Sequence, residues 1–126
     1  MNKQKFFKCD LCGNIVGMVI DKGAPLTCCG EEMSELVPNT VDASVEKHVP
    51  EVTVNGDSIS VQVGSVVHPM EEEHHIAFIY VETENGGQRK NLKVGEAPKA
   101  EFSFAGDKPV AVYEYCNLHG LWKKEL

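Results

Sequence analysis

The sequence has no long hydrophobic run, no excess of positive charge, and no repeat or low-complexity tract. No stretch approaches the roughly 20 apolar residues that a membrane-spanning helix needs. The amino terminus lacks the apolar core and small-residue cleavage site of a secretory signal. The formal net charge of −7 argues against nucleic-acid binding, because phosphate recognition needs a basic face. We therefore expect a cytoplasmic protein that binds neither membranes nor nucleic acids.

Helical periodicity is also missing, and short strand candidates occupy most of the chain. With 126 residues, 42% of them hydrophobic, the chain can form one ordinary domain or a small domain with an appendage. A boundary is expected near residues 37–42. Strands are expected at residues 6–8, 15–20 and 33–36, then at 52–63 as a hairpin turning at Asn55-Gly56, and at 76–83, 90–94, 100–104, 110–115 and 121–124, with a turn at 85–87. This spacing predicts an all-β protein whose larger part is an antiparallel sandwich.

Four of the five cysteines lie within the first 29 residues, where there is no histidine. Cys9 and Cys12 form a C-x-x-C knuckle followed by a glycine, whereas Cys28 and Cys29 are adjacent. Disulfides are a weaker alternative, since a Cys28–Cys29 bridge would close a strained ring. Adjacent side chains normally diverge, so two sulfurs on one ion require an unusual local backbone. A piece this small needs such a metal staple, and four sulfurs fit either zinc or a single iron.

Every histidine lies after that group, and the last cysteine stands three residues before the last histidine. One histidine taken alone is more often structural than a ligand. Here four separate loops or strand ends each carry a possible ligand, and one cysteine has no partner of its own kind. This combination predicts a mixed nitrogen and sulfur metal site. The candidates are His48, His68, His74, His75, Cys116 and His119. His74 and His75 are not both expected to be ligands, because neighbours on an extended segment point in opposite directions.

Motifs spread over nearly the whole chain resemble those of desulfoferrodoxin, the two-iron class of superoxide reductase. They are the cysteine pairs at 9/12 and 28/29, Glu-Lys-His-Val-Pro at 46–50, His-Pro-Met-Glu-Glu at 68–72 with His74, and Tyr-Cys-Asn-Leu-His-Gly-Leu-Trp at 115–122. The resemblance implies a desulforedoxin-like module over residues 1–37 and an immunoglobulin-like superoxide reductase sandwich over residues 38–126. It also implies a homodimer.

The same resemblance implies two iron ions and neither haem nor flavin. Cys9, Cys12, Cys28 and Cys29 would hold the first iron. His48, His68, His74 and His119 would surround the second, catalytic iron in a plane, with the sulfur of Cys116 beneath. His75 matches a position that the family does not use for a ligand.

Five donors at the second site leave one coordination position of an iron open, whereas a tetrahedral zinc site would need only four. The family resemblance implies that an electron passes there to superoxide, and that two protons complete hydrogen peroxide without release of dioxygen. It also implies a rubredoxin-like electron donor.

Glu46 and Lys47 flank His48, and most such pairs are only solvated surface charges. A protein with a net charge of −7 repels an anionic substrate, so Lys47 is expected to create a local attraction beside the metal. Glu46 resembles the family carboxylate that closes the sixth position of the ferric ion. The acidic residues 71–73 are expected to form a solvated loop.

The residues alone leave two other kinds of function open. A blue-copper electron carrier uses two histidines, one cysteine and usually a weak axial methionine, but no methionine follows His119. A purely structural protein with a zinc staple would leave Cys116 without a partner of its own kind.

Overall fold

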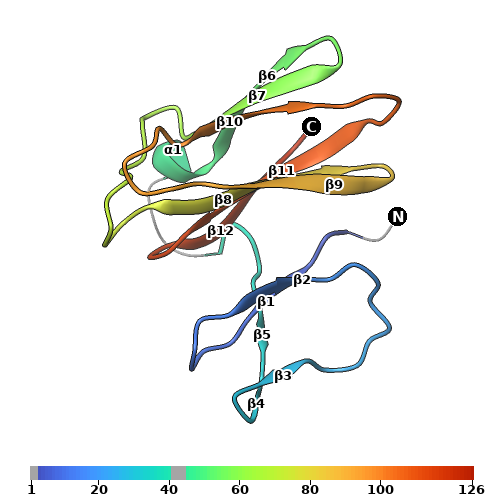
Figure 1. Cartoon of the computed structure of the whole chain (residues 1–126), viewed down its shortest axis with the longest axis vertical. Helices are drawn as coiled ribbons and strands as arrows, with labels where there is room; N and C mark the ends of the chain where they lie inside the picture. Colours follow the sequence, from blue (N-terminus) through green and yellow to red (C-terminus); the bar gives the residue numbers. More distant parts are fainter. Residues whose placement is uncertain (1–2, 41–44) are drawn as a thin grey trace. The chain divides into compact units, whose positions relative to one another are not determined.

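The computed structural model describes residues 3–40 and 45–126, apart from the side chain of Glu46. The chain forms two compact units, Met1–Val37 and Pro38–Leu126 (Figure 1). The regular secondary structure of the described residues is almost entirely β-strand, which confirms the all-β prediction. The helix they contain is a single turn, α1 (Val45–His48), too short to appear as periodicity. No described helix is long and apolar enough to cross a membrane.

The small unit consists of short antiparallel strands around very little apolar core. β1 (Phe6–Lys8) lies between β2 (Ile15–Gly17) and β5 (Ser34–Glu35), and β3 (Thr27–Cys28) pairs with β4 (Glu31–Glu32). Its buried hydrophobic side chains are Phe6, Cys9 and Met33. The strand predicted at residues 15–20 ends at Gly17, and the one predicted at 33–36 covers only residues 34–35. So little buried apolar surface is insufficient to hold this unit together by itself.

The larger unit is a sandwich of two antiparallel sheets, which Figure 1 shows as separate layers. One has the order β10-β7-β6 and the other β12-β11-β8-β9. Their bounds are β6 Pro50–Asn55, β7 Ser58–Val63, β8 Ile76–Thr83, β9 Gly86–Asn91, β10 Lys99–Ser103, β11 Pro109–Cys116 and β12 Gly120–Glu125. Buried aliphatic residues of β7, β8 and β11, with Phe102 and Phe104, form the core. The antiparallel sandwich prediction is therefore confirmed.

Two turns differ from the sequence prediction by one or two residues. Asn55 pairs with Ser58, so the first turn is made by Gly56 and Asp57, with Gly56 at φ 60°. A two-residue hairpin loop favours glycine in this left-handed region. Thr83 pairs with Gly86, so β9 includes both glycines that had been expected in the second turn.

The strand register places three chain segments at one end of the sandwich. β11 ends at Cys116, which pairs with Ile76 at the start of β8 and with Gly120 at the start of β12. At the neighbouring sheet, Pro50 at the start of β6 pairs with Val63 at the end of β7. The backbone N–H of Gly64 donates to the carbonyl of Val49, just after α1, at 3.2 Å. The loops that carry the predicted second-site ligands therefore leave the sheets at these strand ends.

Glu114 is a fully buried carboxyl that the strand pattern did not reveal. It lies on β11 on the same face as Val112 and Cys116, both members of the core cluster. Its exposed fraction is 0%, and neither carboxyl oxygen has a hydrogen-bond partner among the described residues. Burial raises the pKa of Glu114 to about 9. The folded protein thus holds a proton at pH 7 that an unfolded glutamate would release.

We predict that Glu114→Gln stabilises the protein at neutral and alkaline pH. A folded-state pKa above the unfolded value gives stability that is complete below about pH 4.5 and is lost as pH rises through about 9. Glutamine carries no such proton, so the variant should gain about 3 kcal/mol at pH 7 and more at pH 9. Chemical denaturation at pH 5, 7 and 9 measures the free energy of unfolding of both proteins. The exposed carboxylate variant Glu84→Gln is the control, and equal pH slopes for wild type and Glu114→Gln would contradict the prediction.

Candidate metal centres

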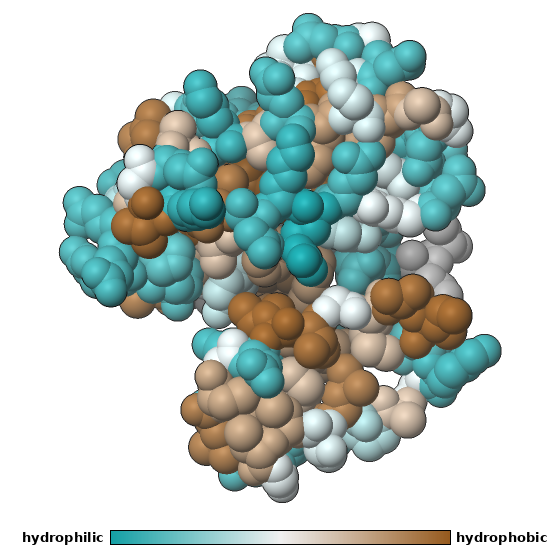
Figure 2. All heavy atoms as spheres, viewed as in Figure 1, coloured by the Kyte–Doolittle hydropathy of each residue, from teal (hydrophilic) through white to brown (hydrophobic). Residues whose placement is uncertain are grey.

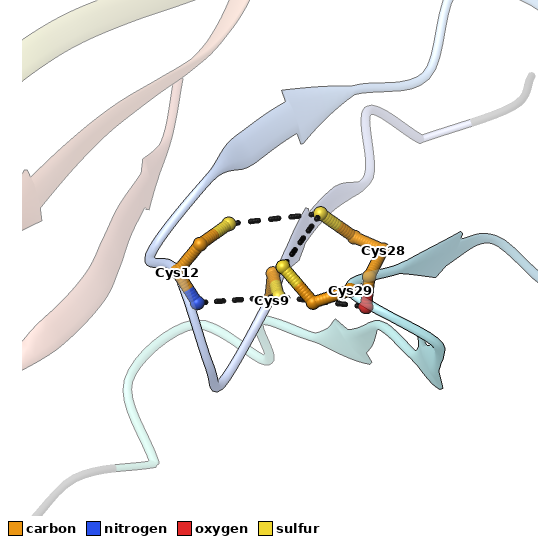
Figure 3. Close-up of side chains that lie close together, drawn as sticks. All are labelled: Cys9, Cys12, Cys28 and Cys29. Carbon is orange, nitrogen blue, oxygen red and sulfur yellow. Dashed lines mark hydrogen bonds between the residues drawn. The ribbon is translucent and has the colours of Figure 1, made fainter.

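The four cysteines of the small unit converge on one point (Figure 3). Cys9 and Cys12 follow β1, Cys28 ends β3, and Cys29 lies in the turn before β4. The sulfur atoms of Cys12 and Cys28 are 3.6 Å apart, and those of Cys28 and Cys29 are 4.0 Å apart. Tetrahedral coordination with bonds of about 2.3 Å places sulfurs about 3.8 Å from one another, whereas bonded sulfurs lie at about 2.05 Å. All five cysteines of the chain are free, so the geometry fits a metal and not disulfides.

An unusual backbone conformation brings the adjacent pair Cys28-Cys29 to the same point. Cys29 has φ 53°, in the left-handed region that residues with a side chain seldom adopt. Glycines with φ of 83° at Gly13 and 76° at Gly30 follow the two cysteine pairs and permit the tight turns. The expected departure from ordinary geometry at the adjacent cysteines is confirmed.

Nitrogen–hydrogen donors surround the sulfur atoms. The backbone N–H of Cys12 donates to the Cys9 sulfur at 3.4 Å, and that of Asn14 donates to the Cys12 sulfur at 3.5 Å. The Asn14 side-chain amide lies 3.7 Å from the Cys28 sulfur. The N–H of Cys12 is the main cause that lowers the pKa of Cys9 to about 7. These donors favour thiolates, the form of cysteine that binds metals. Asn14 was not recognised from the sequence, where its position two residues after the knuckle was the available signal.

A second cluster forms at one end of the sandwich from residues far apart in sequence. His48, His68, His74 and Cys116 each offer a ligand atom within 4.8 Å of the others. His119 joins them, because its Nδ1 lies 3.1 Å from Nε2 of His48 and 3.9 Å from the sulfur of Cys116. The structure thus brings together all five residues predicted for the second iron.

The four imidazole rings are arranged in a closed cycle. Adjacent ring centroids are separated by 4.7 Å for His48–His68, 4.6 Å for His68–His74, 5.1 Å for His74–His119 and 4.9 Å for His119–His48. Adjacent ring planes are near perpendicular, at 74° to 89°. His48 therefore lies across from His74, and His68 across from His119. The Cys116 sulfur is close to every member of this cycle, which is the donor arrangement of a five-coordinate ion.

Hydrogen bonds among neutral imidazoles satisfy these nitrogens only in part, because each ring carries a single N–H. Nδ1 of His68 is 2.7 Å from the carbonyl oxygen of Pro69 and donates to it, which leaves the lone pair of Nε2 facing the cluster. That Nε2 lies 3.2 Å from Nε2 of His48, which in turn lies 3.1 Å from Nδ1 of His119. Nε2 of His74 is buried and has no partner among the described residues. A shared cation satisfies all of these lone pairs at once.

Burial favours the neutral forms of the histidine and cysteine side chains in this cluster. Desolvation lowers the pKa of His68 to about 4, and desolvation followed by the charge of His119 lowers the pKa of His74. Both imidazoles are therefore neutral at pH 7. Desolvation raises the pKa of Cys116, so a bound cation is needed to ionise this thiol.

Trp122 supports two of the cluster histidines. Its ring stacks on His48 with centroids 5.0 Å apart and planes 22° apart. Its indole N–H donates to the carbonyl oxygen of His119 at 3.1 Å. The sequence showed this tryptophan only as part of a motif and did not reveal what it contacts.

The remaining residues singled out from the sequence lie outside the cluster. The Nδ1 atom of His75 is 3.1 Å from the carbonyl oxygens of both Glu71 and Glu72. Residues 71–73 are exposed. Lys47 is exposed, and its charge is among the causes that lower the pKa of His74, after burial and His119. The side chain of Glu46 lies outside the described residues.

Comparison with known proteins identifies the family. Residues 1–36 match the family described as Desulfoferrodoxin, N-terminal domain, and residues 40–125 match the family described as Desulfoferrodoxin. The chain belongs to the desulfoferrodoxin family. The two clusters correspond to the two iron centres of desulfoferrodoxins, one with four cysteines and one with four histidines and a cysteine.

Similar proteins cover either almost the whole chain or about two thirds of it. A desulfoferrodoxin from Nitratidesulfovibrio vulgaris is 47% identical over 98% of this chain and 98% of its own length. The solved structure of a superoxide reductase from Treponema pallidum has a TM-score of 0.83 and 39% identity, covering 98% of this chain and 100% of that one. A superoxide reductase from Pyrococcus horikoshii is 35% identical over 64% of this chain and 86% of its own length.

Proposed function

We propose that this desulfoferrodoxin is a superoxide reductase, which reduces superoxide by one electron to hydrogen peroxide and releases no dioxygen. The observation that carries the proposal is the donor set of the second cluster: four imidazoles in a cycle with one sulfur beside all of them. Five donors exceed the four of a structural zinc site and the three strong donors of a blue-copper site. The similar structure from Treponema pallidum, described as a superoxide reductase, spans both units.

The metal assignments are part of the proposal. Cys9, Cys12, Cys28 and Cys29 hold the first iron in the module of residues 1–37. His48, His68, His74, His119 and Cys116 hold the second iron in the sandwich domain of residues 38–126. When bound there, iron supplies one-electron redox chemistry and an open coordination position for a small anion.

The protein contributes a rigid set of neutral donors. His48 and His68 are 2% and 1% exposed, so their rings cannot reorient without disturbing the core. His48 is held further by the stacked Trp122, and Cys116 is fixed by strand pairing on both sides. Preorganised donors of this kind need no rearrangement when the ion changes its charge.

The central experiment is metal analysis combined with a superoxide-consumption assay. The protein should contain two irons per chain and consume superoxide in the presence of a reductant without producing dioxygen. Cys116→Ser replaces the sulfur that would hold the second iron by a smaller hydroxyl oxygen and should lower the rate by more than about 100-fold, the upper end of the cost of losing a supporting residue. The absorption of the first centre should persist in that variant. Dioxygen evolution, copper, or zinc alone would contradict the proposed function.

Lys47 is proposed to attract the substrate anion. The net charge of −7 repels superoxide at long range, and Lys47 is an exposed cation close enough to affect His74. We predict that Lys47→Ala slows superoxide association about tenfold and weakens its dependence on ionic strength. Pulse radiolysis measures this rate. Lys22→Ala, which removes an exposed charge of the small unit, is the matched control, and an unchanged rate in Lys47→Ala would remove the role.

Glu46 is proposed to supply the carboxylate that closes the sixth position of the oxidised iron. The support for this proposal is its place in α1, two residues before His48. We predict that Glu46→Ala changes the charge-transfer absorption of the oxidised second centre and the pH dependence of that band, because a solvent-derived ligand replaces the carboxylate. Optical spectra from pH 5 to 10 measure both. Glu51→Ala, an exposed glutamate on β6, is the control, and identical spectra for wild type and Glu46→Ala would exclude ligation.

Homodimer formation and a rubredoxin-like electron donor are also proposed, in a reducing cytoplasm. Much of the visible face of the small unit is apolar (lower part of Figure 2), and Val19 and Ile20 are 96% and 71% exposed. Such residues are available to pack against a second copy.

All five cysteines are free, as in reducing compartments. A monomeric mass by ultracentrifugation would contradict the dimer, and failure of a reduced rubredoxin to re-reduce the second iron would contradict the donor.

A further inference from the structure

The side chain of Asn117 connects two loops that carry ligands of the second cluster. Asn117 immediately follows Cys116, but its side chain crosses to the loop before β8, more than 40 residues away in sequence. Its Oδ1 accepts a hydrogen bond from the backbone N–H of His75 at 2.9 Å. Its Nδ2 donates to the carbonyl oxygen of Glu73 at 3.1 Å. Both ends of one amide are therefore used.

These two contacts lie on either side of His74. One involves the residue before it and the other the residue after it, so the amide of Asn117 spans the backbone of the ligand itself. A third bond, from the backbone N–H of Asn117 to the carbonyl of His75 at 3.2 Å, joins the same two loops without the side chain. The orientation of the amide is determined, because one atom must accept from an N–H group and the other must donate to a carbonyl.

His74 depends on such support more than His48 and His68 do. His48 and His68 are almost fully buried, whereas His74 is half-buried on a loop whose preceding residues are exposed. Its backbone is otherwise held by a two-bond bridge to Glu71, with distances of 2.9 and 3.1 Å, which lies within the same loop. Asn117 supplies side-chain bonds that tie this loop to the strand end that bears Cys116.

We propose that Asn117 is a positioning residue that holds His74 in the plane of the second iron centre. The proposal rests on the proposed assignment of His74 and Cys116 as ligands of one ion. By fixing both peptide groups beside His74 to the residue next to Cys116, the amide sets the distance between an imidazole ligand and the thiolate ligand. Losing a residue that orients a ligand typically weakens metal binding by about 10–100-fold.

The test compares Asn117→Ala and Asn117→Asp with Asn85→Ala. Asn85 also joins two loops through its side chain, which donates to Asp107 at 3.2 Å, but it lies beyond the opposite end of β8. Iron release to a chelator is followed separately at the two centres by their absorption. Asn117→Ala should release the second iron at least about tenfold faster, with the first centre and Asn85→Ala unchanged.

Asn117→Asp distinguishes the contributions of the two side-chain hydrogen bonds. It also replaces Asn117→Ala in the test if the alanine variant does not fold. Aspartate keeps the acceptor for the His75 N–H but turns a carboxylate oxygen toward the Glu73 carbonyl oxygen, so iron release should accelerate at least about threefold, as expected for one lost hydrogen bond. In the iron-loaded protein, hydrogen exchange at the His75 amide should be about tenfold faster in Asn117→Ala and unchanged in Asn117→Asp.

Equal iron release from the second centre in wild type and the folded Asn117 variants would overturn the proposal. So would equal acceleration at both centres, or equal acceleration in Asn85→Ala, because a general loss of stability would then explain the result. These outcomes are independent of the superoxide assay. Failure of the wild type to consume superoxide would contradict the proposed function. The comparison of iron-release rates would still test the role of Asn117.

Discussion

The larger unit of this protein is organised around imidazole nitrogens that face one another, on rings that are buried or half-buried. Nε2 of His48 lies within 3.2 Å of a nitrogen of His68 and within 3.1 Å of a nitrogen of His119, and Nε2 of His74 has no partner among the described residues. Lone pairs at these distances repel unless a proton or a cation lies between them. Burial disfavours protonation, as the pKa of about 4 at His68 shows. A neutral ring has one N–H and bridges one such pair, whereas a metal cation accepts all of these lone pairs at once. The fold supplies the rigidity that keeps the donors in place for it.

The sandwich provides that rigidity through its strand ends. Cys116 pairs with the first residues of two neighbouring strands, so the thiol cannot move without disturbing three strands. The histidines come from a helical turn, the connection between β7 and β8, and the hairpin loop between β11 and β12. Trp122 and Asn117 connect these segments. The interior can even retain an unpartnered carboxyl at Glu114, two residues from this thiol. The protein thus tolerates a buried carboxyl that lowers its stability next to the metal-binding cluster, as is common near functional sites.

The small unit shows a different relation between metal and fold. Three buried hydrophobic residues and strands of two or three residues cannot outweigh the entropy of ordering almost 40 residues. The left-handed Cys29 adds backbone strain that an isolated turn would relax. Coordination of four thiolates offsets both costs, because metal binding is coupled to folding in modules of this size. In the sandwich the fold positions the ligands, whereas in the small unit the ligands hold the fold.

The sequence by itself determined the all-β class, the grouping of ligands into a sulfur-rich set and a histidine-rich set, and the motifs that place the chain in its family. These properties depend on residue type and local spacing, and β8 could even be predicted to the residue. Only the tertiary structure decided the order of the four rings, the nitrogen that each presents, and the supporting contacts of Asn117, Trp122 and Asn14. It also revealed the neutral carboxyl of Glu114 in the core. These features depend on strand register and on contacts between residues more than about 70 positions apart, which local sequence patterns do not encode.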